Sequence, residues 1–222
     1  MKFFEFGKEN DREMIMITVL IIAALGHVIC GITDCMLAYT KDGRFEFSDI
    51  KDNAKMQKTF SSMALKQIEL AMLMGVFALF MAGFGYIEIS RWISETSPVI
   101  GGIMLVASMF FIVLISAHHV LCGAVEWFYV KLGRTEEALK AVMDFFKSTA
   151  IAAIAYVGLL VFAVIFFVLV VAGKTDLPRW ACIFNTFPAF LILAPTKAPA
   201  KGNIANAFMF LGLSVMFFYR CI

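Results

Sequence analysis

The chain has 222 residues, of which 61% are hydrophobic and only 16% are charged. Soluble domains carry roughly 45–50% apolar and ~25% charged residues, so this composition excludes an ordinary soluble protein and predicts one that lies in a lipid bilayer. The net charge of +2 offers no general electrostatic footprint for nucleic acid, and we expect no nucleic acid partner. The five cysteines have neither zinc-finger nor disulfide-framework spacing, and we expect them to be reduced.

Six apolar segments follow one another along the chain and predict an all-α bundle of transmembrane helices in one integral membrane domain, residues 1–222. Each segment has roughly 15–30 residues, against the ~20 that cross a bilayer. The segments are residues 14–39, 70–89, 99–130, 149–172, 180–194 and 204–219. The fifth is the shortest and contains Asn185 and Pro188, which favour a kink or a break in the helix.

Two connections between these segments carry helical patterns of their own. Residues 48–66 intersperse apolar side chains among charged ones. Residues 135–147 begin with Thr135, an N-cap residue type, followed by Glu136 and Glu137, and then place apolar residues at helical spacing. Two interpretations stay open: amphipathic helices at the membrane interface, or helical extensions of the next span.

The distribution of basic residues predicts an orientation. Six spans put both termini on the same side of the membrane. The loops after the first, third and fifth segments carry twelve Lys or Arg residues, and the opposite side carries seven. The positive-inside rule then predicts that the loops with twelve are cytoplasmic and that both termini lie outside.

An eight-residue motif that occurs twice within apolar segments is the best indication of a site. The first copy runs from His27 to Asp34 and the second from His119 to Glu126, 92 residues later, and both read H-V-[I/L]-C-G-x-x-[D/E]. Ionisable groups are costly in a bilayer and mark functional sites there. Because residues three, four and seven apart share a helix face, the His, Cys and acid of each copy should point inward. His118 cannot share that face with His119 and should point elsewhere.

The first and third spans run in the same direction, so the two copies should meet in one leaflet. We predict that His27, Asp34, His119 and Glu126 approach one another, with at least one histidine–carboxylate contact between the two helices. Polar residues at the starts of the second and sixth spans fall on the same side: Gln67, Glu69, Asn203 and Asn206. The equal polarity of the two copies also suggests a parallel internal repeat, with spans one and two matched to spans three and four.

Four kinds of chemistry fit these residues, and the sequence leaves all four open. His27, His119, Asp34 and Glu126 offer imidazole and carboxylate ligands for a metal such as Zn²⁺ or Fe²⁺. The same four are candidate catalytic acids and bases for an intramembrane enzyme that acts on a lipid-soluble substrate. They also fit a proton or cation pathway in a transporter. In a structural lock or a sensor, they would only pair helices or bind a small lipophilic ligand, with His27 against Glu126 and Asp34 against His119 in the lock.

Three short motifs add a resemblance to a known family. They are Gly31, Asp34 and Leu37 in the first span, Pro178-Arg179-Trp180 before the fifth, and Gly202-Asn203 before the sixth. Together they resemble an uncharacterised family of multi-pass bacterial membrane proteins, a domain of unknown function. The resemblance implies a helical membrane fold and a location in the bacterial cytoplasmic membrane, and it implies no activity.

Overall fold

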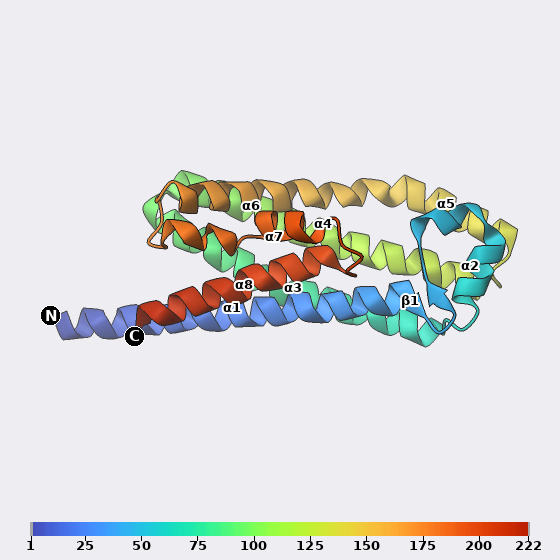
Figure 1. The fold of residues 1–222 in the computed structure, drawn as a ribbon, viewed down its shortest axis with the longest axis horizontal. Coiled ribbons are helices and arrows are strands. Elements are labelled where there is room, and N and C mark those ends of the chain that lie inside the picture. The colour runs from blue at the N-terminus through green and yellow to red at the C-terminus, as the bar shows by residue number, and fades with distance from the viewer. Residues whose placement is uncertain (1, 222) are drawn as a thin grey trace.

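The computed structural model describes residues 2–221, and it describes their side chains except for residues 2–10, 47–48 and 221. This part of the chain is almost entirely helical (Figure 1). The long helices are α1 (Lys2–Ala38), α3 (Leu65–Thr96), α4 (Pro98–Lys131), α5 (Glu136–Thr149), α6 (Ala155–Val171) and α8 (Lys201–Cys221). The short helices are α2 (Asn53–Phe60), α7 (Thr186–Leu193), η1 (Phe47–Lys51), η2 (Ala150–Ile154) and η3 (Arg179–Ile183). One small antiparallel hairpin pairs β1 (Tyr39–Thr40) with β2 (Gly43–Arg44).

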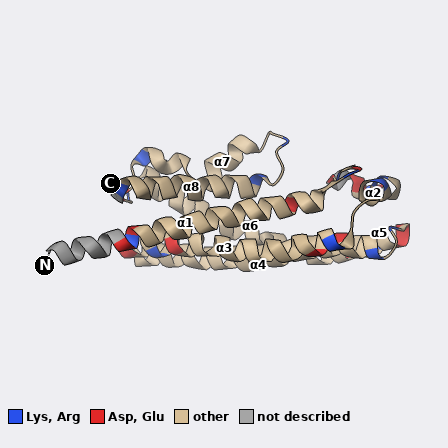
Figure 2. Cartoon of the chain, turned by 90° about the horizontal axis from the view of Figure 1, so that it is seen from below, with Lys and Arg blue, Asp and Glu red and all other residues tan. Residues whose placement is uncertain are grey.

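In the described part of the chain, five helical stretches are long and apolar enough to cross a membrane. They are residues 11–38, 65–96, 98–131, 136–171 and 201–220. Figure 2 shows Lys, Arg, Asp and Glu gathered towards the two ends of the bundle, with a mostly uncharged band between them. Large apolar side chains in that band face outward, among them Phe77 and Val106, each 70% exposed. This distribution suggests an integral membrane protein, because outward apolar side chains are stable where lipid covers them.

The predicted fifth span is not a continuous helix, in agreement with the kink or break expected at Asn185 and Pro188, and six spans are not confirmed. The chain breaks at Phe184 and Asn185, between η3 and α7. The Asn185 side chain accepts a hydrogen bond from Phe187 N (2.8 Å) as the N-cap of α7 and donates one to Ala163 O on α6 (3.0 Å). The eight residues of α7 span only about 12 Å, well short of a bilayer. The broken segment leads the chain from the end of α6 along the bundle, and α8 then runs back in the opposite direction. The N- and C-termini therefore lie at the same end of the bundle (Figure 1).

The helices pack in a series that leaves α6 and α8 as its two ends. In that series α6 packs on α4, α4 on α3, α3 on α1, and α1 on α8. The α7 helix packs against α8 and α6, which links the ends of the series over part of its length. Figure 2 shows α7 and α8 on one face of the bundle and α3 and α4 on the opposite face. Close packing depends on small residues: a Cβ added at Gly26 of α1 would meet Ala78 O of α3 at 2.5 Å.

The hairpin, η1 and α2 form a cap over the end of the bundle where α4 ends and α5 begins (Figure 1). Arg134, in the α4–α5 turn, donates from Nε to Phe60 O (2.9 Å) and from Nη2 to Met63 O (3.2 Å). The cap buries Met56 and Phe60 against Leu139 of α5. The two predicted amphipathic segments therefore differ: residues 53–60 form a separate capping helix, and residues 136–149 extend the next span through η2.

Candidate functional site

A partly enclosed cavity of about 310 Å³ lies between the bundle and the cap. Its walls come from α1, α3, α4, α5, α6 and α8, and apolar side chains of the cap, such as Phe45 and Ile50, close it at one end. Most of the lining is apolar. The polar or titratable lining residues are Cys30, Asp34, His118, His119, Cys122, Glu126, Tyr129, Tyr156, Asn203 and Asn206. Three of the four residues predicted from the repeated motif, Asp34, His119 and Glu126, thus line one cavity.

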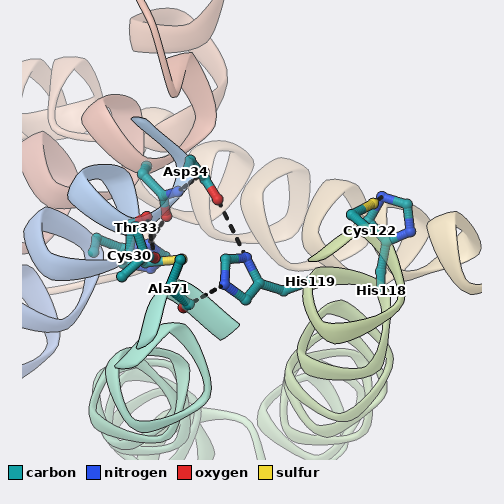
Figure 3. Close-up of polar contacts among 9 residues, drawn as sticks. Cys30, Thr33, Asp34, Ala71, His118, His119 and Cys122 are labelled. Atoms are coloured by element: carbon teal, nitrogen blue, oxygen red, sulfur yellow. Dashed lines mark hydrogen bonds and ion pairs between the residues drawn. The ribbon is translucent and has the colours of Figure 1, made fainter. Parts of the chain in front are cut away.

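The predicted histidine–carboxylate contact between the first and third spans is present. His119 Nδ1 on α4 lies 3.2 Å from Asp34 Oδ1 on α1 (Figure 3). The His119 ring is almost fully buried, whereas the Asp34 side chain keeps 37% of its surface exposed. The contact bridges two helices that each pack on α3.

The position of His119 depends on α3. Its Nε2 atom lies 3.2 Å from Ala71 O, to which it donates a hydrogen bond (Figure 3). One turn further along α3, a Cβ added at Gly75 would overlap the His119 ring, so glycine is what lets the ring enter this space. Both ring nitrogens therefore face acceptors, Ala71 O and the Asp34 carboxylate. This geometry needs a second proton on the pair, or a cation, between Nδ1 and Oδ1.

Asn203, at the start of α8, extends the network from Asp34 to His27. Its Nδ2 donates to Asp34 Oδ2 (2.7 Å), and its Oδ1 lies 2.8 Å from His27 Nδ1. Since Asn203 Oδ1 can only accept, His27 Nδ1 carries the proton. His27 Nε2 then accepts from the Tyr86 hydroxyl at 3.1 Å. The hydrogen bonds run in one direction from α3 through α1 and α8 to Asp34.

His27 itself is not part of the cavity lining. Its side chain is 1% exposed and stacks on Phe210, with ring centroids 5.7 Å apart. Its partners are Asn203 and Tyr86, so only half of the structural lock forms: Asp34 pairs with His119, but His27 does not pair with Glu126. The two motif copies therefore make different contacts, and an internal repeat stays a prediction.

Glu126 lines the cavity, and one of its two carboxyl oxygens has no hydrogen-bond partner in the described part of the chain. Its Oε2 atom is buried and has no hydrogen bond to any residue that the structure describes. The neighbouring residue Trp127 instead donates from Nε1 to Glu69 Oε1 (3.0 Å), which ties α4 to α3. A buried carboxyl oxygen without a partner is costly, so native proteins rarely keep one unless water, an ion or a ligand satisfies it.

His118 points away from the His119 ring (Figure 3), as the helical geometry predicts. His118 also lines the cavity, and its Nε2 lies 3.6 Å from Cys122 Sγ, four residues along α4 (Figure 3). Its ring meets Tyr156 of α6 edge-on, at 6.4 Å between centroids. The two adjacent histidines diverge as helical geometry requires, but the cavity extends from α3 past α4 to α6 and reaches both.

Among the described residues, one group of three possible metal ligands includes Cys30, which is not among the predicted ligands. Cys30 Sγ, an Asp34 carboxylate oxygen and a His119 ring nitrogen all lie within 4.8 Å of one another. Neither His27 nor Glu126, both predicted metal ligands, belongs to this group. The motif held the signal, because Cys30 precedes Asp34 by four residues, one helical turn. The sequence carries a weaker signal for Tyr86, because a single tyrosine within the apolar run of α3 does not indicate a site.

Comparison with known proteins places the chain in a family but assigns no activity. Neither the curated proteins nor the solved structures gave a match. One family model, described as a family of unknown function, DUF6796, matches residues 8–221. This range covers nearly the whole chain and confirms the expected resemblance to an uncharacterised family. The chain therefore belongs to the DUF6796 family.

Proposed function

We propose that this chain binds a lipid-soluble molecule that carries a polar end group, and that the cavity holds the polar end near Asp34, His119 and Glu126. An intramembrane enzyme is the class of protein that this arrangement fits best. Ionisable groups at the end of an apolar cavity can give or take protons on a substrate that water does not reach.

The observation that carries the proposal is the Glu126 carboxyl group. A buried oxygen without a partner loses its hydration and gains nothing in exchange, which costs roughly 1–3 kcal/mol. A hydroxyl, amine or amide group of a ligand in the cavity would supply the missing hydrogen bond to Glu126 Oε2. The purely structural alternative expects the polar groups to pair with one another and to leave no cavity.

The walls support a ligand with an apolar body. The volume of about 310 Å³ is at the lower end of the ~300–1,000 Å³ typical of small-molecule sites. Phe111 and Ile115 of α4 and Leu159 of α6 line the part that extends towards the middle of the bundle. A chain or ring system of modest size would contact these residues while its polar end stays at the level of Asp34.

The transporter alternative has less support. The hydrogen-bonded chain from His119 ends at Tyr86, whose side chain is 0% exposed. The Tyr86 ring meets Phe111, Phe162 and Phe210 edge-on, with centroids 4.9–5.4 Å apart. A proton that reached Tyr86 would find no further polar group among these rings.

For the orientation in the membrane, we propose that the basic end of the bundle, with the cap, lies on the cytoplasmic side of a bacterial membrane and that both termini lie outside.

Photolabelling of the detergent-purified chain tests the binding proposal. The probe is a fatty alcohol with a diazirine in its chain and an alkyne for detection. We expect labelled peptides to come from the cavity lining on α4 and α6, and an excess of unlabelled fatty alcohol to suppress the labelling. Val125→Trp should abolish it, because Val125 lines the cavity and a tryptophan there would fill much of it.

Val113→Trp is the matched control. Val113 lies on the same helix with its side chain outward, 60% exposed, so its replacement leaves the cavity unchanged. The proposal is wrong if labelling falls only on outward-facing positions, or if both tryptophan variants are labelled like the wild type.

A further inference from the structure

We infer that Cys30, Asp34 and His119 form a binding site for a divalent transition-metal ion, with Zn²⁺ as the best fit, at the polar end of the cavity. The inference does not depend on the proposed function, since a metal can bind whether or not a lipid-soluble molecule does.

The distances between the three donors suit one ion. Zn²⁺ lies ~2.0–2.3 Å from nitrogen, oxygen and sulfur ligands, which puts tetrahedral ligand atoms about 3.3–3.8 Å apart. His119 Nδ1 and Asp34 Oδ1 are already 3.2 Å apart. Cys30 Sγ, an Asp34 carboxylate oxygen and a His119 ring nitrogen lie within 4.8 Å of one another, so the sulfur has to move closer by at most about 1 Å to reach tetrahedral spacing. Cys30 and Asp34 sit one helical turn apart on α1, and this spacing places both on the same face.

The surrounding hydrogen bonds orient the donors as in known metal sites. A metal-bound histidine usually donates its other N–H to a backbone carbonyl or a carboxylate, and bound carboxylates are themselves hydrogen-bonded. Here His119 Nε2 donates to Ala71 O, and Asn203 Nδ2 donates to Asp34 Oδ2. These bonds leave His119 Nδ1 and Asp34 Oδ1 free to face the same point. A metal ion at that point replaces the extra proton that the His119–Asp34 contact otherwise requires.

The donor types and their charges select the ion. Mg²⁺ and Ca²⁺ prefer shells of oxygen, whereas a thiolate, an imidazole and a carboxylate suit Zn²⁺ or Fe²⁺. With a thiolate at Cys30, a carboxylate at Asp34 and a neutral His119, a divalent ion makes the site electrically neutral. Neutrality matters because Cys30 and His119 are buried within the apolar part of the bundle, 3% and 8% exposed.

The fourth coordination position would open into the cavity. Cys30, Asp34 and His119 all line the cavity, and no further His, Cys, Asp or Glu joins their group among the residues that the structure describes. Three protein ligands with one open position are typical of catalytic zinc sites, whereas structural sites have four. The open position would accept water or the polar end of a bound molecule.

Cobalt substitution tests the site in the full-length chain. The detergent-purified protein is stripped with EDTA and titrated with Co²⁺, and a second sample is loaded with Zn²⁺ and assayed for metal by mass spectrometry. We expect one ion per chain and a thiolate-to-cobalt charge-transfer band in the near ultraviolet. Cys30→Ser should abolish the band, and Asn203→Ala should weaken binding by about 10–100-fold, the usual effect of losing an outer-shell partner.

Cys122→Ser is the matched control, because Cys122 is a thiol of the same cavity outside the group of three. It should keep both the band and the stoichiometry. If Cys30→Ser does not fold, Asp34→Asn, which preserves the side-chain shape, takes its place and should lose stoichiometric binding. A wild type that binds no Co²⁺ or Zn²⁺, or a band that survives Cys30→Ser, would overturn the inference. The photolabelling experiment above is read out separately, so either proposal can fail alone.

Discussion

Replacing Gly75 by alanine perturbs the site without removing any of its polar groups. Gly75 lies on α3, and an added Cβ there would overlap the His119 ring. The ring must move, and its hydrogen bonds to Ala71 O and to Asp34 must lengthen or break. The matched control is Gly102→Ala on α4, where an added Cβ has no neighbouring atom within 4 Å.

The expected loss of stability follows from three contributions. Overpacking costs ~1–3 kcal/mol. The two His119 contacts contribute ~0.6–1.7 kcal/mol each, as interhelical hydrogen bonds in membrane proteins do. Alanine regains ~1 kcal/mol over glycine within a helix. The sum is a destabilisation of roughly 1–5 kcal/mol, centred near 3 kcal/mol, which lowers Tm by about 6–12 °C in a chain of this length. Gly102→Ala should leave Tm unchanged or raise it slightly.

Thermal unfolding in detergent, followed by circular dichroism, measures both variants. A double-mutant cycle with His119→Ala then identifies the cause. Without the imidazole ring, the extra Cβ at position 75 has room, so Gly75→Ala should cost almost nothing in that background. The reasoning is refuted if Gly75→Ala melts like Gly102→Ala, or if its cost is the same with and without the His119 ring.

Three further predictions concern the cap and the broken segment. Arg134→Gly allows the positive φ of 60° but removes the guanidinium that donates to the cap. Amide hydrogen exchange in residues 53–63 should therefore become faster than in the wild type, while exchange in α6 stays the same. Exchange in residues 53–63 at the wild-type rate would contradict this. Asn185→Ser keeps an oxygen that can cap α7 but loses the amide donor to Ala163 O, so it should cost about 1 kcal/mol less in thermal unfolding than Asn185→Ala, which loses the cap as well; equal costs would rule out the cap. The Ser61 hydroxyl bonded to Asp42 (2.6 Å) lowers the pKa of that carboxyl group; its contribution to the cap is therefore present at neutral pH and lost as the pH falls below about 4. Asp42→Asn should reduce the acid-induced rise in cap exchange, and an unchanged rise would show that Asp42 does not cause it.

The candidate site shows which contacts a sequence pattern can predict and which it cannot. Spacing of three, four and seven residues correctly put Asp34 and His119 on facing helices, and their contact is confirmed. The same pattern could not tell that His27 would turn to Asn203 and Tyr86 instead. Periodicity assigns a residue to a helix face, but its partner depends on how neighbouring helices are rotated and how far they slide along each other. Those two quantities come from packing all the helices together.

The fifth span has the break that Asn185 and Pro188 predicted, but the contact that holds the break in place was not predictable. Its composition is as apolar as that of its neighbours, and hydropathy alone cannot distinguish a spanning helix from a broken one. The break depends on Asn185, which caps α7 and also bonds to Ala163 O on α6, a residue 22 positions earlier. Only the folded bundle supplies that second partner, and without it a polar side chain in the middle of an apolar segment has no fixed direction.

The sequence by itself determined the helical fold, the helices that are long and apolar enough to span a membrane, and two of the residues that meet in the bundle. These follow from local properties: apolar length, helical period and the cost of charge in lipid. The tertiary structure decided which donors share a space, that Cys30 joins Asp34 and His119, and that Glu126 Oε2 finds no hydrogen-bond partner among the described residues. Such relations depend on contacts between helices far apart in the chain, such as the entry of the His119 ring into the space left by Gly75, and no local pattern encodes them.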